Sequence, residues 1–364
     1  MGIGAIENGG PWWGKVEAAV DYWFGPGASA GFETNGDALA RLNTMADALA
    51  VPRLSNLESR LSCRGKINAI IAALGIPAEA AFYFDFREGR SFGALPQLVR
   101  HTKTWARDAT GEIHEFEIDQ LARFNGLGAV LAPARTRLSL APGRVGASPW
   151  NSSGSIAFTE LDPEGFFIPC RIESGGAATD RRQSGLFSMT VNAPVSVLAR
   201  YRAGTSPTTR IYVRSGALAM QSLLSGNVGA LAQTQSQAGF FSNIQNRHLG
   251  DGLYEVAATF TPVATQSDWR LSIGPGSTVA GEYVDALGAQ VTSGPAEWVF
   301  GEPSAQVAVA ADQIFVEGLA GNHALHILLA DDMEIAVLGW NAADPVPLAG
   351  IDGRPVRSIT GVAS

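Results

Sequence analysis

Paired carboxylates are the first side chains in this sequence that could do chemistry, because hydrolysis of a glycosidic bond needs two of them roughly 5–9.5 Å apart. Residues 157–294 contain ten acidic side chains: Glu160, Asp162, Glu164, Glu173, Asp180, Asp251, Glu255, Asp268, Glu282 and Asp285. No motif fixes a pair among them, and most stand at turn positions, where aspartate favours local hydrogen bonds. We therefore assign no catalytic residues and expect a protein that is not an enzyme.

Histidines could hold a metal, but their spacing argues against it. His323 and His326 are the one close pair, and the apolar residues after them predict a strand, on which the two side chains face opposite ways. A zinc site needs three or four convergent ligands, so we expect no metal centre and no cofactor. Cys63 and Cys170 are the only cysteines. One disulfide is allowed by that count, although two buried thiols fit the sequence better.

Aromatic rings beside planar polar side chains could bind a sugar, because the rings offer apolar faces while amide and guanidinium groups pair with hydroxyls. The best such segment is 240–247, which we expect to be a loop. The candidate binding residues are Phe240, Phe241, Asn243, Asn246, Arg247, Trp269 and Tyr283. The alternative is that the aromatic residues are core, most strongly for Trp269, which stands in an apolar alternation.

The elements that would position these side chains lie in residues 151–295, where the pattern predicts an all-β domain. Short β-rich runs recur between glycine, proline, serine and asparagine at roughly 8–12-residue spacing, which is typical of a sandwich or jelly roll. The predicted strands are 187–191, 195–202, 209–213, 252–261 and 269–273. Residues 218–250 are polar and rich in glutamine, serine and asparagine. We expect them to be a long loop region with one or two strands.

The rest of the chain divides into β-rich flanks and a helical start. The segments 80–150 and 296–364 alternate like strands, and we expect them to pack together. In residues 1–79, leucine and alanine recur at helical spacing, and Gly75-Ile76-Pro77 is a helix-stop signal. The predicted fold class is α+β and multidomain, with a small helical N-terminal region followed by antiparallel β modules that include a jelly-roll sandwich.

The helical region is rich in large aromatic residues, which often mark a surface that docks onto a partner. The candidate docking residues are Trp12, Trp13, Trp23 and Phe24. The alternative is that they form a small core of the region itself.

Composition argues against two classes of partner. The formal net charge is −8 and no basic stripe is present, so we expect no nucleic-acid partner. The longest apolar run, residues 67–76, is too short to span a bilayer. Residues 1–13 lack the features of a secretory signal. We therefore expect a protein made in the cytoplasm, without membrane insertion.

Four stretches, taken in order, resemble one family. They are Phe84-Asp85-Phe86 with Gly89, Arg107-Asp108 with Gly111 and Ile113, Ala122-Arg123-Phe124 with residues 128–136, and Gly288-Ala289-Gln290 followed by Ala310-Ala311-Asp312. Over roughly residues 82–318 the chain is similar to the tail-fibre or head-spike proteins of tailed phages and phage-like gene transfer particles, which carry a carbohydrate-binding jelly roll. We expect Arg107, Arg123 and Arg135 to be scaffold, because an arginine fork satisfies backbone and carboxylate acceptors well.

The resemblance implies a structural virion protein, made in the bacterial cytoplasm, that binds a host cell-surface polysaccharide. Residues 1–79 would attach it to other virion proteins. It also implies a homo-oligomer, a trimer by default or a pentamer at a capsid vertex. A structural calcium in the jelly roll is compatible with the resemblance. Two alternatives stay open: a capsular polysaccharide depolymerase on the same scaffold, and a purely architectural particle component.

Overall fold

The computed structural model describes residues 11–30, 35–55, 60–77, 79–124, 126–301, 305–351 and 354–363. The chain forms two compact units. Unit 1 comprises Met1–Arg100, Asp119–Leu131 and Asp312–Ser364, and unit 2 comprises His101–Ile118 and Ala132–Ala311. The chain therefore crosses from one unit to the other after residues 100, 118, 131 and 311. The expected boundaries at 79/80, 150/151 and 295/296 do not coincide with this division, because each unit is assembled from separated segments.

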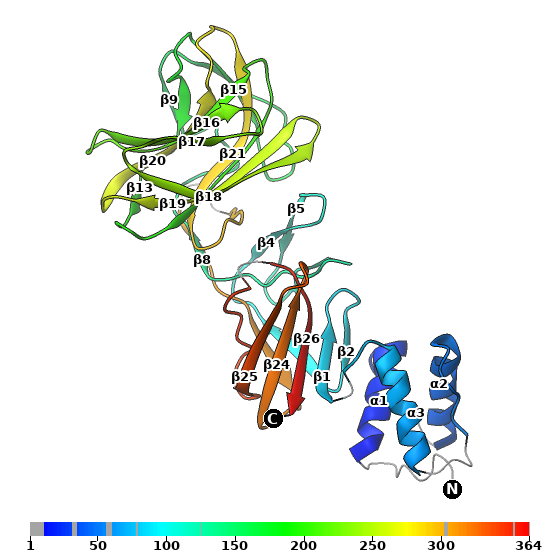
Figure 1. Ribbon diagram of the computed structural model, residues 1–364. Helices are drawn as coiled ribbons and strands as arrows, with labels where there is room; N and C mark the ends of the chain where they lie inside the picture. Colours follow the sequence, from blue (N-terminus) through cyan, green and yellow to red (C-terminus); the bar gives the residue numbers. More distant parts are fainter. Residues whose placement is uncertain are drawn as a thin grey trace. The chain divides into compact units, whose positions relative to one another are not determined.

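Unit 1 begins with three helices, α1 (Pro11–Phe24), α2 (Asn35–Ala48) and α3 (Arg60–Ala73), drawn in blue in Figure 1. Leu42, Ile67 and Ile70 are fully buried among them, as the helical spacing of apolar residues predicts. After α3, Gly75 adopts a φ of +75°, which is the expected helix stop. No described helix combines the length and the hydropathy needed to cross a bilayer.

The β part of unit 1 is an antiparallel sheet in the order β2-β1-β26-β24-β25, with β7 on β26 and β6 on β7. These strands and the separate pair β3–β23 are β1 (Ala80–Asp85), β2 (Arg90–Phe92), β3 (Leu95–Val99), β6 (Arg123–Phe124), β7 (Gly128–Ala129), β23 (Gln313–Glu317), β24 (Asn322–Leu329), β25 (Glu334–Asn341) and β26 (Val356–Ala363). Figure 1 shows β1 and β26 side by side. Through β1–β26 and β3–β23, the two flanking segments associate as expected.

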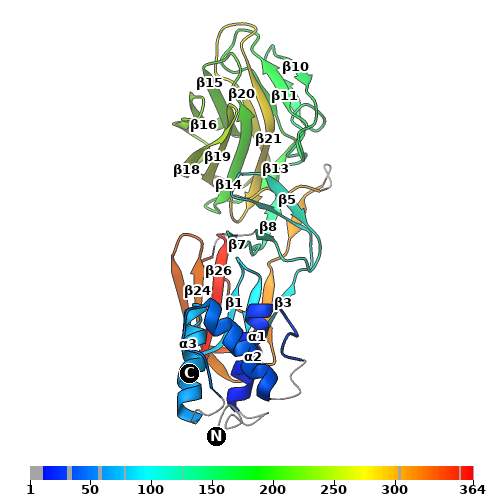
Figure 2. The same cartoon turned by 90° about the vertical axis from the view of Figure 1, so that its right-hand side faces the viewer.

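Unit 2 is an antiparallel sandwich of two sheets (Figure 2). The first sandwich sheet runs β10-β11-β21-β14-β19-β18, with β8 on β21 and β22 on β8. Its strands are β8 (Arg135–Arg137), β10 (Ala157–Glu160), β11 (Cys170–Glu173), β14 (Val195–Arg202), β18 (Gly239–Gly250), β19 (Leu253–Pro262), β21 (Tyr283–Ser293) and β22 (Val307–Val309).

The second sandwich sheet runs β17-β16-β15-β20-β12-β9, with β13 on β20. Its strands are β9 (Asn151–Ser153), β12 (Arg181–Gln183), β13 (Phe187–Met189), β15 (Thr208–Ser215), β16 (Met220–Asn227), β17 (Ala232–Ser236) and β20 (Gln266–Pro275). A separate hairpin of unit 2 consists of β4 (Thr104–Arg107) and β5 (Ile113–Phe116). The predicted α+β class with an antiparallel sandwich is confirmed.

The main core of the sandwich includes Val197, Ile211, Phe260 and Cys170. Burial raises the pKa of the Cys170 thiol to about 11, because desolvation disfavours the thiolate. Cys63 lies instead in the helical core of unit 1, so no disulfide joins the two cysteines.

A second core in unit 2, which includes Leu198 and Trp298, covers the outer face of the first sandwich sheet. There the Glu255 carboxylate accepts hydrogen bonds from Trp298 Nε1 at 2.8 Å and from Arg200 Nη2 at 3.0 Å. It also accepts one from Arg107 of the β4–β5 hairpin. Arg135 Nη2 donates to Thr104 Oγ1 at 3.2 Å. The scaffold role expected of Arg107 and Arg135 is therefore confirmed.

The expectation for residues 218–250 is wrong, because they form three strands, β16, β17 and β18, in place of a loop region. Their polar side chains are satisfied in a sheet because solvent or neighbouring amides bond them, as when Gln221 Nε2 donates to Gln235 Oε1 at 3.0 Å. Polar composition therefore did not prevent strand formation at the edges of the sandwich.

Candidate functional site

The predicted sugar-binding segment 240–247 lies within β18, an edge strand of the first sandwich sheet, and is not a loop. Alternation along this strand separates its two aromatic residues. Phe240 is 60% exposed, whereas Phe241 is 7% exposed and packs on Phe260 in the core. Phe240 therefore stays a candidate for contact with a ligand, and Phe241 offers no face to one.

The polar candidates on β18 are exposed, but each has a hydrogen-bond partner within the fold, Asn243 only a long one of 3.5 Å to Thr259 Oγ1. The Asn246 side chain exchanges two hydrogen bonds of 3.0 Å with the backbone of Leu231. Arg247 donates to Gln245 Oε1 at 2.6 Å and reaches Glu255 Oε1 at 3.4 Å. Asn243 has a φ of +50° where the register of the β18–β19 pair shifts. These contacts give Asn246 and Arg247 a structural part.

The remaining candidates do not converge with β18. Trp269 is fully buried, so we remove it from the candidate surface. Tyr283 lies under the Arg171 guanidinium, which is 3.8 Å from the ring centroid. Phe240 and Tyr283 flank opposite ends of the β14 strand, which are roughly 25 Å apart for eight antiparallel residues. The predicted residues therefore form no single site.

The aromatic residues of α1 that were predicted to dock onto a partner mostly pack within unit 1. Trp13 is 3% exposed in the helical core, so it offers no surface to a partner. Trp23 and Phe24 are half-buried and line a cavity of about 540 Å³ with residues of the β1–β2 hairpin. The Arg41 guanidinium lies 4.8 Å from the Phe24 ring centroid. The side chain of Trp12 lies outside the described residues.

A different surface emerges on the outer face of the second sandwich sheet. Along β15 the side chains alternate, so that Ile211 and Val213 enter the core while Arg210, Tyr212 and Arg214 face outward. On β20, Leu271 and Ile273 enter the core, which turns Arg270 and Ser272 outward. Register then decides which of these outward residues become neighbours.

Three rows of outward side chains cross the sheet at this place. In the first row Arg214 lies opposite Arg270 on one side and Gln221 on the other. The second row joins Leu223, Tyr212, Ser272 and Gln183. In the third row Arg210 lies opposite Gly274, and a Cβ added at Gly274 would come within 2.8 Å of Arg181 Cα. We call this surface the arginine face and define it as Arg181, Arg210, Arg214, Arg270, Tyr212, Ser272, Gln221 and Gln235.

The four arginines of the arginine face form no ion pair with a described residue. Among the described residues, no carboxylate lies within 4.0 Å of the guanidinium groups of Arg181, Arg210, Arg214 or Arg270. Two acidic residues lie close in sequence to these arginines, Asp180 next to Arg181 and Asp268 on β20 two residues before Arg270. Backbone amides bind both carboxylates: Asp180 accepts from Gly175 N at 2.7 Å, and Asp268 accepts from Ala217 N.

The inner part of the arginine face is tightly packed. The Arg181 guanidinium lies 4.5 Å from the Tyr212 ring centroid, and burial lowers the pKa of Arg181 by disfavouring its charged form. Tyr212 Oη and Arg210 Nη1 both donate to Ala178 O, at 3.1 Å and 2.8 Å. Arg181 and Tyr212 are therefore held in place, while Arg210, Arg214 and Arg270 are partly exposed.

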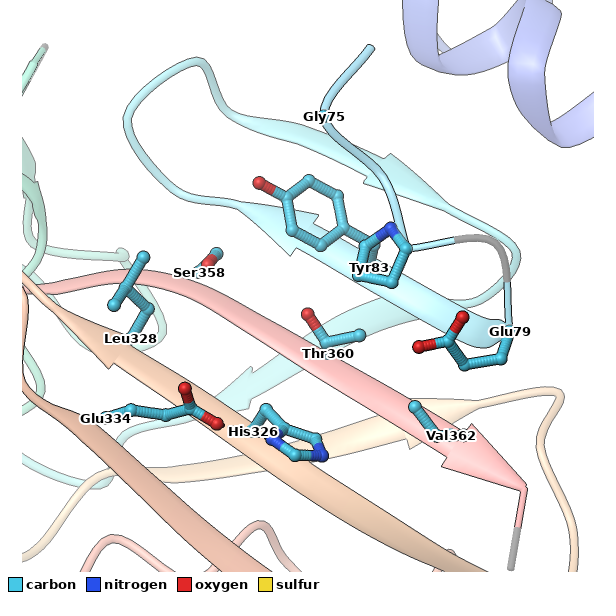
Figure 3. A pocket seen from close by; sticks show the side chains of 10 residues that line it. Gly75, Glu79, Tyr83, His326, Leu328, Glu334, Ser358, Thr360 and Val362 are labelled. Atoms are coloured by element: carbon cyan, nitrogen blue, oxygen red, sulfur yellow. Dashed lines mark hydrogen bonds and ion pairs between the residues drawn. The ribbon is translucent and has the colours of Figure 1, made fainter. Parts of the chain in front are cut away.

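A second candidate is a cavity of about 310 Å³ in unit 1, on the polar face of its sheet (Figure 3). Register places Tyr83, Thr360 and His326 in one row across β1, β26 and β24. Burial raises the pKa of the Tyr83 hydroxyl, and the nearby Asp85 adds to the shift. His326 Nδ1 is hydrogen-bonded to Glu334 Oε1. The cavity offers hydroxyl, imidazole and carboxylate groups to a small polar ligand.

The structure separates the two close histidines, as predicted. His323 is 5% exposed and packs near Trp340, whereas His326 faces the polar cavity. Among the described residues, the side chains of Asp108, Glu112 and His114 bring potential metal-ligand atoms within 4.8 Å of one another. Asp108 Oδ1 already accepts from Thr110 N at 2.8 Å, and Asp108 Oδ2 lies 2.9 Å from His114 Nε2. This cluster therefore closes the β4–β5 turn, and we assign no metal to it.

Comparison with known proteins gives no family. No family model and no curated protein matches the chain. Among solved structures, the CBM22-1 and GH10 modules of the Clostridium thermocellum xylanase 10B in complex with xylohexaose align with 43% of this chain and 28% of that one, at 10% identity and a TM-score of 0.27. The CBM22-1 xylan-binding domain of Paenibacillus barcinonensis Xyn10C aligns over 43% of this chain and 90% of that one, at 14% identity and a TM-score of 0.27.

Proposed function

We propose that this chain is a structural protein of a phage or phage-like gene transfer particle, a spike or fibre, and that its sandwich binds a host surface polysaccharide. The virion part of the proposal rests on the ordered motifs between residues 84 and 312. The binding part rests on one observation, the planar polar side chains that follow one another across the outer face of the second sandwich sheet.

The row of planar polar side chains that contains Arg214 and Gln221 has the length and the chemistry to bind a sugar polymer. Arg270, Arg214, Gln221 and Gln235 stand on the neighbouring strands β20, β15, β16 and β17, and the last two are joined by a hydrogen bond. Four strands at about 4.8 Å spacing extend the row over roughly 14 Å, which suits an extended oligosaccharide better than a single sugar. Amide and guanidinium groups supply paired donors and acceptors for sugar hydroxyls.

Attachment to the particle belongs to unit 1 in this proposal. Residues 1–79 contact other virion proteins, with the cavity beside Trp23 and Phe24 as the candidate contact. Each particle carries several copies, as a trimer or as a pentamer at a vertex. Weak binding by one sandwich is then multiplied, because linked sites act at a high effective concentration.

The binding test uses the intact chain and an array of bacterial surface polysaccharides. The variant Gln221→Ala with Gln235→Ala removes the amide pair, and Gln245→Ala on the first sandwich sheet is the matched control. We expect the double variant to bind at least about tenfold more weakly and the control to bind like the wild type. Equal binding by the wild type, the double variant and the control would show that the polysaccharide does not bind at the arginine face.

The particle test is immunogold electron microscopy with an antibody against residues 157–294. Label at capsid vertices or at a tail tip is the expected result. Unlabelled particles, with reducing ends or unsaturated sugars released from capsule by the protein, would replace the proposal with the depolymerase alternative. Labelled particles with a blank array would favour the purely architectural alternative.

A further inference from the structure

We infer that the polysaccharide bound by the arginine face is acidic, carrying carboxylate, sulfate or phosphate groups. This inference rests on the proposed function and adds the chemical class of its ligand. It starts from a contrast between the two sheets of the sandwich, which place arginines outward in the same way but pair them differently.

On β11 and β14 of the first sandwich sheet, the outward arginines have acidic partners. Arg171 Nε lies 2.9 Å from Asp285 Oδ1, Arg202 Nη1 lies 2.8 Å from Glu164 Oε1, and Arg200 Nη2 lies 3.0 Å from Glu255 Oε2. Arg171 and Asp285, like Arg200 and Glu255, are directly opposite each other on neighbouring strands. The outward arginines of β11 and β14 are therefore neutralised by acidic residues of the same unit.

On the second sandwich sheet the partner opposite Arg214 is another arginine, Arg270. Side chains directly opposite on antiparallel strands have Cβ atoms roughly 4.5–5.5 Å apart, and like charges there destabilise the sheet. Neither side chain makes a hydrogen bond or an ion pair with another described residue. A bound anion between them would turn this repulsion into attraction.

Donors on the arginine face outnumber the acceptors that the described chain supplies. Arg210 and Arg181 each donate to one backbone carbonyl, Ala178 O and Thr179 O, although a guanidinium carries five N–H donors. The Arg181 Nε and the Ser272 hydroxyl are buried without a hydrogen-bond partner among the described residues. The guanidinium fork matches the paired oxygens of carboxylate, sulfate and phosphate groups.

The whole chain carries a net charge of −8, so a general positive field does not attract a polyanion. Binding must then be local to the arginine face. Because three of its four arginines are partly exposed, the attraction should be screened by salt.

The test measures binding of the intact protein to immobilised polygalacturonate and dextran sulfate, with dextran and xylan as neutral polymers and duplex DNA as a polyanion of another class. Arg214→Gln and Arg270→Gln are made singly and together. Arg202→Gln, which removes a partly exposed arginine paired with Glu164, is the matched control. Thermal melting accompanies each variant, and the double variant should melt no lower than the wild type because a like-charge pair has been removed.

We expect one of the acidic polysaccharides to be retained at least tenfold more strongly than the neutral ones, and each Arg→Gln change to weaken retention by about tenfold or more. Retention should fall steeply as salt rises from about 50 mM to about 500 mM. The control variant should bind like the wild type.

Contrary outcomes separate the two proposals. Binding of a neutral polysaccharide that is indifferent to Arg214 and Arg270 would overturn the acidic ligand and leave the proposed function standing. Failure to retain any polysaccharide of either class would overturn both. Retention of duplex DNA more strongly than the acidic polysaccharides would overturn the acidic glycan as the specific ligand. A loss of binding in the Arg202→Gln control equal to that in the Arg214→Gln and Arg270→Gln variants would do the same.

Discussion

At the scale of single residues, Glu255 shows how much of unit 2 depends on one carboxylate. Burial raises its pKa, but the charges of Arg107 and Arg200 together with hydrogen bonds from Trp298 and Arg107 outweigh burial, so the net pKa shift is downward. Its partners come from the β4–β5 hairpin, from β14 and from Trp298. One side chain therefore ties two other segments, the β4–β5 hairpin and the segment of Trp298, to the first sandwich sheet.

We predict that Glu255→Gln strongly destabilises the sandwich, by about 3–5 kcal/mol, because removing one member of a buried ion cluster leaves its partners uncompensated. The matched control is Glu164→Gln, which breaks a half-exposed pair with Arg202 and should cost less than about 1 kcal/mol. Urea unfolding of both variants checks this. Equal midpoints for the two would mean that the Glu255 cluster contributes no more than a surface pair.

Asp108 makes the stability of the folded state depend on pH. Partial burial raises its pKa, but hydrogen bonds from Thr110, His114 and the amide of Glu112 outweigh this and lower the pKa from 3.8 to about 2. A carboxyl group whose pKa is depressed by folding stabilises the folded state above its unfolded pKa, and this contribution is lost as the pH falls. The window here is from about pH 4 down to about pH 2.

We therefore predict that Asp108→Asn loses less stability than the wild type over that window, measured as the unfolding midpoint at each pH. Asp162→Asn, at an exposed aspartate, is the matched control and should follow the wild type. A wild-type and an Asp108→Asn curve with the same slope would contradict the assignment.

At the scale of elements, Gly128 explains how the short strand β7 can lie against β26. Its φ is +112°, and a Cβ atom there would stand 2.2 Å from Val356 O. A side chain at this position would meet both a strained backbone conformation and the neighbouring strand. This glycine also begins the run 128–136 that carries part of the family resemblance.

We predict that Gly128→Ala destabilises unit 1 by about 2 kcal/mol or more, since backbone strain and the clash add. Gly14→Ala is the control, because Gly14 lies in α1 with no atom within 4 Å of an added Cβ. That change should leave stability unchanged or raise it by up to about 1 kcal/mol, as alanine favours a helix. Thermal melts of the two variants that move in the same direction would contradict this account.

At the scale of the whole molecule, the two compact units predict two unfolding events. Each unit has its own buried clusters, those of Ile327 and Leu42 in unit 1 and that of Phe260 in unit 2. Calorimetry of the intact chain should resolve two transitions, with Gly128→Ala lowering one and Glu255→Gln the other. A single transition shifted by both variants would show that the units unfold together.

Prediction from the sequence succeeded where local pattern decides the structure. Alternation located β14, β15 and β19, and helical spacing with a glycine stop located α3. The opposite orientation of His323 and His326 followed from strand geometry alone. These features depend on residues that are close together in the chain. The sequence alone is therefore enough to predict them.

Prediction failed where tertiary context decides. The glutamine-rich segment 218–250 resembles a loop in composition but forms strands, because cross-strand amide bonds satisfy it. The arginine face could not be predicted, because Arg214 meets Arg270, and Arg210 comes near Arg181, only through the register of three strands distant in sequence. The residues next to Arg214 in the sequence do not indicate that its cross-strand partner is an arginine and not an acidic residue.

The four crossings between the units have a mechanical consequence. Under the proposed function, a particle held at a cell surface would pull on unit 2, the unit proposed to bind the ligand. A unit on a single tether would pass the whole tension through one segment of chain. Here four segments, after residues 100, 118, 131 and 311, share that tension. A single cut at any one of them would still leave the sandwich covalently joined to another segment of unit 1, but only a cut after residue 311 would keep the covalent path to residues 1–79.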